Sequence, residues 1–126
     1  MRALSPTAAA TKLGIQLAHA GRKASARRPW EGGQPLAPGE DAWQTIAPSA
    51  IAFGPDWPVP REMTAADMER VRDGFVDAAK RAIRAGIDAI ELHAAHGYLL
   101  HSYLSPISNK QRWLRRFAHR AHALSP

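Results

Sequence analysis

The sequence contains no cysteine, which excludes a disulfide framework and a thiolate metal site. It also has no run that approaches the ~18 apolar residues of a membrane-spanning helix, so we expect a soluble protein without a membrane partner. The absence of cysteine fits a reducing compartment, and we expect a cytoplasmic location. With 126 residues, the chain is long enough for one modest domain.

Two further absences bear on which nucleotide cofactors and nucleic-acid partners can be expected. No glycine-rich phosphate-binding motif is present, so a nucleotide cofactor held as in a Rossmann domain is not supported. No acidic residue occurs from Arg112 to Pro126, where arginines contribute to the formal net charge of +6. A basic tail could contact nucleic acid, but no known nucleic-acid-binding motif accompanies it. We therefore expect a solvated, disordered tail over 113–126 and no nucleic-acid partner.

Prolines are concentrated between residues 27 and 62, which hold seven of the ten in the chain. Because proline fixes φ and removes a hydrogen-bond donor, this segment cannot form a long helix or a central strand. A loop of this length is either an ordered functional element or disordered, and its aromatic side chains argue against disorder. We predict an ordered excursion over one mouth of the fold, with a short strand over 50–53. The aromatic residues are Trp30, Trp43, Phe53 and Trp57.

A long helix is predicted from Thr64 to Gly86. Thr64 suits the N-cap, Asp67 can complete a capping box, and Gly86 suits the position after the helix. We expect Gly74, inside the helix, to allow close packing. Shorter helices are expected within residues 1–12 and over 101–106. The long helix carries one apolar stripe at spacings of three and four, formed by Met68, Val71, Phe75, Ala78, Ala79 and Ala82.

Two short apolar stretches, 13–19 and 87–93, are predicted to be strands. The order strand, loop, helix, strand predicts parallel strands joined by a right-handed crossover. Polar groups follow each strand at its carboxyl end, where parallel α/β sheets bind ligands. We interpret the chain as α/β, a partial (β/α)₈ TIM barrel. A complete barrel needs roughly 250 residues, so the chain would hold about half of one.

His93 and His96 follow the second predicted strand, and three roles compete for them. They could donate hydrogen bonds to a carbonyl or nitro oxygen, or they could bind zinc with His101 or Glu91. They could also be structural histidines bonded to backbone. The zinc alternative lacks the His-Glu-x-x-His order, and we assign no metal site. Tyr98 could serve as a proton donor or be an ordinary half-buried tyrosine.

Gln16 is a polar residue in the otherwise apolar first strand. If it is buried it must find a hydrogen-bond partner. Its amide both donates and accepts, which suits the edge of a pyrimidine-like ring, but it could equally bond a neighbouring strand. Arg22 and Lys23, just beyond that strand, are expected to face solvent or pair structurally rather than to bind phosphate.

Three motifs together resemble the old yellow enzyme family, and most nearly its bacterial xenobiotic-reductase branch. Residues 14–23, Gly-Ile-Gln-Leu-Ala-His-Ala-Gly-Arg-Lys, are similar to the family's third barrel strand. Residues 47–53 and 60–64 resemble the following loop and helix start. Residues 90–100, with Leu-Ser-Pro at 104–106 and Ser-Asn at 108–109, resemble the fourth strand and the turn after it. The match covers roughly residues 13–112, in the family's order.

The resemblance implies an FMN-dependent, NAD(P)H-using ene-reductase that transfers hydride to a small molecule with an activated alkene or nitro group. Gln16 matches the glutamine that binds the flavin's pyrimidine edge. His93 and His96 match the pair that holds the substrate oxygen, and Tyr98 matches the proton donor. Glu91 and His19 match family positions without an assigned role.

The sequence departs from the family at both ends. The family's opening strands are absent before Met1, and after Arg112 the family's Tyr-Gly-Gly-Ser is replaced. Codons permissible for Trp113 onwards, read one base later, can spell Gly-Tyr-Gly-Gly-Ser, so we hypothesise a frameshift that the DNA sequence would test. Residues 1–112 would then be a partial barrel. A partial barrel leaves sheet edges open, so the chain could pair as a homo-oligomer. The alternative to an enzyme is an inactive fragment without catalysis of its own.

Overall fold

The computed structural model describes residues 11–111. The helix expected within 1–12 and the tail over 113–126 therefore fall wholly or almost wholly outside the described part. The elements are the strands β1 (Gly14–Leu17), β2 (Ile46–Ala47), β3 (Arg61–Glu62) and β4 (Ala89–Leu92), the short 3-10 helices η1 (Gly21–Lys23) and η2 (Pro29–Glu31), and the helices α1 (Ala65–Arg84) and α2 (Leu99–Leu104).

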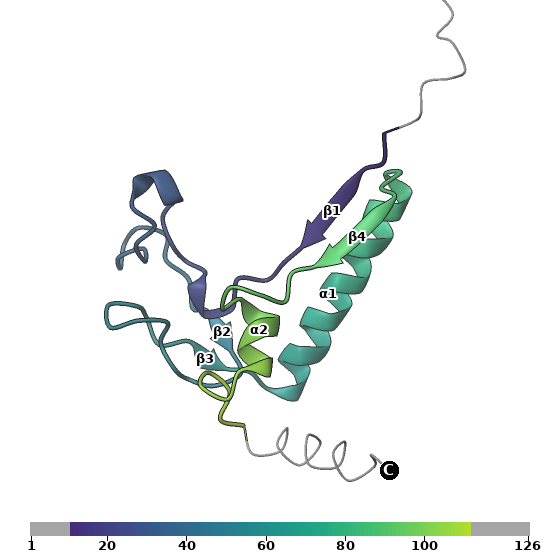
Figure 1. Ribbon diagram of the computed structural model, residues 1–126. Helices are drawn as coiled ribbons and strands as arrows, with labels where there is room; N and C mark the ends of the chain where they lie inside the picture. The colour runs from purple at the N-terminus through teal and green to yellow at the C-terminus, as the bar shows by residue number, and fades with distance from the viewer. Residues whose placement is uncertain (1–10, 112–126) are drawn as a thin grey trace, which may run out of the picture.

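The two predicted barrel strands pair in parallel. β1 lies beside β4 with Gly14 opposite Ala89 and Leu17 opposite Leu92. The ladder continues beyond both ends, where the amides of Asp88 and His93 donate to the carbonyls of Leu13 and Leu17 at 2.9 Å each. The helix α1 runs alongside this two-stranded sheet (Figure 1). The predicted strand–loop–helix–strand order and the parallel pairing are confirmed.

The start and end of α1 agree with the capping signals. The Asp67 amide donates to Thr64 Oγ1 at 3.2 Å, and the Thr64 amide donates to Asp67 Oδ2 at 2.9 Å, which completes the capping box. Gly86 follows the helix with φ +82°. The prediction for Gly74 is wrong, because a Cβ atom built there would meet open space among the described residues. The shorter predicted helix is α2, which ends before Pro106.

The proline-rich segment is ordered but holds different strands from the one expected. β2 pairs with β3 in parallel, Ile46 opposite Arg61. The strand predicted over 50–53 is absent, because its carbonyls are occupied otherwise. Arg22 donates to the carbonyls of Ile51 at 3.2 Å and Ala52 at 2.9 Å. This segment and α2 lie together at the carboxyl-terminal ends of β1 and β4 (Figure 1), so the predicted excursion over that mouth is confirmed.

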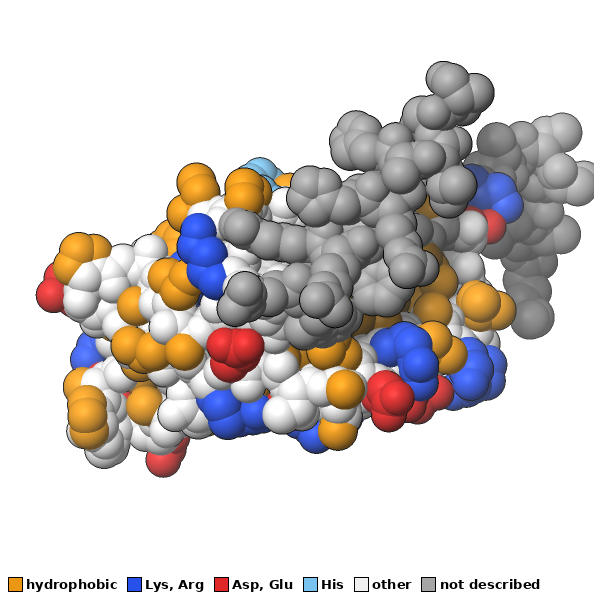
Figure 2. All heavy atoms as spheres, turned by 90° about the horizontal axis from the view of Figure 1, so that it is seen from below, with side chains coloured by type: hydrophobic (Ala, Val, Ile, Leu, Met, Phe, Trp, Pro, Cys, Tyr) orange, Lys and Arg blue, Asp and Glu red, His pale blue; other side chains and the backbone are white. Residues whose placement is uncertain are grey.

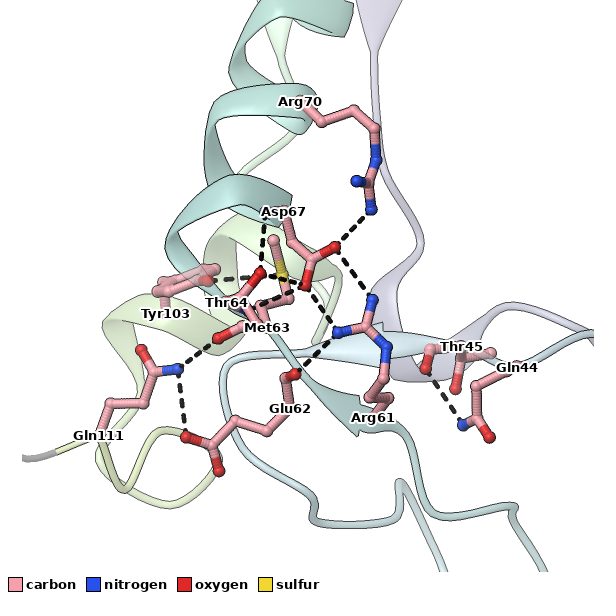
Figure 3. A network of polar contacts seen from close by, with 10 residues as sticks. All are labelled: Gln44, Thr45, Arg61, Glu62, Met63, Thr64, Asp67, Arg70, Tyr103 and Gln111. Atoms are coloured by element: carbon pink, nitrogen blue, oxygen red, sulfur yellow. Dashed lines mark hydrogen bonds and ion pairs between the residues drawn. The ribbon is translucent and has the colours of Figure 1, made fainter.

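A network of polar contacts joins the start of α1 to its surroundings (Figure 3). Asp67 is 3% exposed, and its carboxylate accepts from Arg61 at 2.7 and 3.0 Å and pairs with Arg70. The Arg61 hydrogen bonds, and then the Thr64 amide, hold the pKa of Asp67 well below its usual range. Gln111 donates to the Met63 carbonyl at 3.2 Å. The network therefore ties β3, α1 and the end of the described chain together.

Burial is concentrated away from the β1–β4 sheet. Within residues 11–111 the buried hydrophobic side chains are Ala47, Met63, Ala82 and Leu99. No residue of β1 or β4 itself is buried, and Leu92 is 55% exposed. Figure 2 shows hydrophobic side chains at the surface among charged ones. The described helices include none long and apolar enough to cross a membrane.

Candidate functional site

The site lies at the carboxyl-terminal ends of β1 and β4. Side chains alternate between the two faces of a strand. Leu17 and Leu92 both line hollows against α1, so they mark the helix-facing side. Gln16 and Glu91, one position earlier in each strand, therefore point to the opposite, open face. His93 is two residues after Glu91, so its side chain lies on the same, open face.

Gln16 is paired to Glu91 on the open face. Its Nε2 donates to Glu91 Oε1 at 2.9 Å, across the register pair that the two residues form. This bond leaves the amide oxygen and the second amide hydrogen for another partner. The two residues line a hollow of about 400 Å³ together with Gly14, Ile15, Ala89 and Ile90.

His93, His96 and Tyr98 come together directly after β4. The ring centroids of His93 and His96 are 5.1 Å apart, and those of His93 and Tyr98 are 4.8 Å apart with the rings nearly perpendicular. His93 is 8% exposed, whereas His96 is exposed and Tyr98 is half-buried. The structure thus brings three of the four predicted site residues into one cluster, with Gln16 on the neighbouring strand.

The proline-rich segment and η1 cover one side of this cluster. Lys23 Nζ donates to the His96 carbonyl at 3.0 Å and lies 5.4 Å from the centre of the Tyr98 ring. The same ammonium group lies 4.8 Å from the centre of Phe53, which packs edge-on against Trp57. The expected structural pairing of Arg22 and Lys23 is confirmed, but the contact of Lys23 with the cluster was not foreseen.

A turn that contains His19 follows β1. His19 Nδ1 accepts from the Gly21 amide at 3.0 Å, and the His19 carbonyl accepts from the Leu99 amide at 2.9 Å. Burial lowers the pKa of His19. Gly21 has φ +60°, and a Cβ atom there would lie 3.1 Å from the Leu99 backbone. Only glycine fits this turn without strain, and the turn locks η1 against α2.

The described residues contain no group of three or more histidine, aspartate or glutamate side chains that could hold a metal ion. His101, which with Glu91 was one of the two residues considered for completing a zinc site, accepts a hydrogen bond at Nδ1 from the Gly97 amide at 2.8 Å. Gly97 and His101 are four residues apart at the start of a helix, a spacing at which a side chain can reach a backbone amide. Histidine is not a usual capping residue, so the sequence alone does not predict this contact.

Comparison with known proteins agrees with this architecture. Residues 7–112 match the NADH:flavin oxidoreductase / NADH oxidase family. An NADH:flavin oxidoreductase of Gibberella zeae is 54% identical, with 79% of this chain covering 25% of that protein. An NADPH dehydrogenase of Geobacillus thermodenitrificans is 50% identical over the same shares. The structure of morphinone reductase in complex with tetrahydroNAD superimposes with a TM-score of 0.63 at 29% identity, covering 80% of this chain and 29% of that one.

The chain spans about a quarter of the length of the curated relatives it matches. Its two parallel strands, the helix between them and the loop at their ends are one part of a TIM barrel. The family match, the identities and the superposition all cover the segment that carries the motifs. The chain belongs to the NADH:flavin oxidoreductase / NADH oxidase family, the old yellow enzyme family that its motifs resemble.

Proposed function

We propose that this chain carries the flavin-contacting and substrate-contacting part of an FMN-dependent, NAD(P)H-using ene-reductase. The substrates would be small molecules with an activated carbon–carbon double bond or a nitro group. One observation carries the proposal, namely that His93, His96 and Tyr98 converge at the end of β4, on the sheet face that Gln16 shares. The family relationship supports it, and the relatives' names support a nicotinamide reductant. We place the activity in the cytoplasm.

FMN is the cofactor of this family, and the residues present fit it. Gln16 offers a free amide oxygen and one amide hydrogen on the open face, which is the donor and acceptor pair that a pyrimidine edge requires. Glu91 Oε1 accepts the other amide hydrogen, with 2.9 Å between Gln16 Nε2 and Glu91 Oε1, and so favours one orientation of the amide. When bound, the reduced flavin supplies a hydride for the substrate.

The three aromatic side chains would act on the substrate. His93 and His96 would donate hydrogen bonds to the carbonyl or nitro oxygen, where negative charge develops during reduction. Donors that are already in place stabilise such charge without reorganisation. Tyr98, whose ring packs against His93, would deliver a proton to the neighbouring carbon from its hydroxyl.

The test is a titration of the purified 126-residue chain with FMN, followed by flavin fluorescence and visible absorbance. Saturable binding is expected, and Gln16→Ala should weaken it about tenfold or more, because an amide contact to a buried polar edge is lost. Gln34→Ala is the matched control, since Gln34 is an exposed glutamine in the proline-rich segment. It should leave the affinity unchanged.

Two results of the titration would contradict the proposal. A folded chain that does not bind FMN, or that binds it equally well after Gln16→Ala, would make this chain an inactive fragment of the family. The exposed edges of β1 and β4 make self-association relevant, so the titration should be repeated across chain concentrations. Affinity that rises with chain concentration would indicate that a homo-oligomer completes the flavin site.

A further inference from the structure

His101 lies beside the site, and the proposed reaction gives it no role. It is exposed and lies in the first turn of α2. Its Nδ1 accepts a hydrogen bond from the Gly97 amide at 2.8 Å. A neutral imidazole accepts at one ring nitrogen and carries its proton on the other, so His101 must hold its proton on Nε2 to make this contact.

The contact reaches a turn whose backbone is strained. His96 has φ +56° and Gly97 has φ +76°, so two successive residues are left-handed. Residues other than glycine are uncommon in this region, although histidine enters it more often than most, and such conformations persist only where the surroundings fix them. The turn separates His93 from Tyr98 along the chain, so its shape decides whether the Tyr98 ring meets the His93 ring.

Side chains from two elements fix the polar backbone groups of this turn. His101 accepts from the Gly97 amide, and Ser102 Oγ donates to the Gly97 carbonyl at 3.1 Å. On the other side Lys23 donates to the His96 carbonyl at 3.0 Å. The turn is thus held from α2 and from η1 at once, and His101 supplies the acceptor that binds its amide.

The residue before α2 departs from the usual capping choice. Tyr98 occupies the N-cap position and makes no side-chain capping hydrogen bond. Serine, threonine, aspartate or asparagine would be the stabilising choices there. The third helical residue, His101, reaches back to the Gly97 amide, one residue before the N-cap, whereas in a capping box it would bind the amide of the N-cap residue itself. Local rules are most often broken at functional sites.

We propose that His101 is a positioning residue, which holds the left-handed turn at His96–Gly97 and thereby aims His96 and Tyr98 toward His93. The roles of those three rings rest on the proposed function, but the geometry that His101 imposes does not. His101 would touch neither flavin nor substrate. Its effect would pass entirely through the backbone of Gly97.

Two substitutions test whether the effect of His101 depends on a hydrogen-bond acceptor at the position of Nδ1 or only on a polar side chain at residue 101. His101→Asn places an amide oxygen where Nδ1 stands, and His101→Gln places it one bond further out. In the isotope-labelled 126-residue chain, NMR would follow the exchange of the Gly97 amide and the nuclear Overhauser contact between the His93 and Tyr98 rings. In His101→Gln we expect Gly97 exchange about tenfold faster, which corresponds to one lost hydrogen bond, and a weakened ring contact. His101→Asn should restore both.

A merely structural role would give a different pattern. If His101 acted only by stabilising α2, the amides of Ser102 and Ser105, which donate to the Tyr98 and His101 carbonyls, would lose protection together with Gly97 in His101→Gln. That result would overturn the proposal, as would an unchanged Gly97 amide and ring contact in His101→Gln. The FMN titration with Gln16→Ala tests the proposed function separately. Failure of flavin binding would remove that function, while the exchange and ring measurements would still decide the role of His101.

Discussion

Two regions of this molecule differ sharply in how they are held. The junction, where η1, β2, α2 and residues 108–111 meet, holds fully buried residues, among them Leu99 at 0% exposure and Ser102 at 1%. The β1–β4 sheet makes a regular parallel ladder, yet its residues are exposed or half-buried. Figure 1 shows the junction below the sheet, at the carboxyl-terminal ends of the two strands.

The difference indicates which parts of the barrel fold depend on local contacts. Hydrogen bonds between side chains and backbone hold the junction together. Asn109 Nδ2 donates to the Tyr103 carbonyl at 2.9 Å, and the Lys110 amide donates to Ser49 Oγ at 2.8 Å. The sheet leaves apolar faces uncovered, as expected of a chain that spans a quarter of the relatives it matches. His93, His96 and Tyr98 lie in the loop that leads into α2 of the junction, so their placement depends less on the uncovered sheet faces than that of Gln16 in β1.

The largest effect should come from emptying the junction. Leu99→Ala removes a fully buried side chain, and we expect it to lower the free energy of unfolding by about 2–5 kcal/mol. The matched substitution in the sheet is Leu92→Ala, where the side chain is 55% exposed and the expected loss is below about 1 kcal/mol. Urea unfolding followed by circular dichroism would measure both. Equal losses would contradict the contrast between the regions.

A pair of glycine substitutions should give opposite signs. Gly21→Ala forces a Cβ atom to 3.1 Å from the Leu99 backbone at φ +60°, so we expect a loss of about 1–3 kcal/mol. Gly74→Ala lies inside α1 with open space around the new atom, and should stabilise by up to about 1 kcal/mol. Thermal melting of the two variants beside wild type tests the pair. Destabilisation by Gly74→Ala would mean that the helix face is covered in solution.

The same contrast separates what the sequence could predict from what it could not. The helix 65–84 and its cap follow from local propensity and apolar periodicity, which act within a few residues. The parallel strand pairing follows from the order of the elements along the chain. The convergence of His93, His96 and Tyr98 was expected through family resemblance, because spacing alone left three roles open. The two-residue strands β2 and β3 carry no periodicity, and the strand expected over 50–53 was wrong because a guanidinium from η1 takes its carbonyls. Contacts between distant segments, such as Lys23 with the His96 carbonyl, have no local signal.

Acid should weaken the start of α1, which the network of Figure 3 joins to the junction, through Asp67. Its pKa is depressed chiefly by Arg61, so the folded chain keeps this carboxylate ionised where the unfolded chain would bind a proton. The stabilisation is therefore complete above the ordinary aspartate pKa of about 3.9 and is lost as the pH falls below it. Asp67→Asn should lower the urea midpoint at pH 7, and the difference from wild type should shrink at pH 3. A difference that stays constant between these pH values would show that the charge contributes nothing.

The smallest effect should be at Tyr103, at the edge of the same junction. Burial, followed by the charges of Asp67 and Glu62, raises the pKa of Tyr103 to about 12. The folded state therefore favours the neutral phenol, and stability from this group is present below the unfolded pKa of about 10 and is lost as the pH rises toward 12. Tyr103→Phe gives up only a hydroxyl contact to Met63 Sδ at 3.4 Å, so at pH 7 we expect a change below about 1 kcal/mol. A spectrophotometric titration of tyrosinate should lose its latest step in this variant, and an unchanged late step would show that Tyr103 is not the buried phenol.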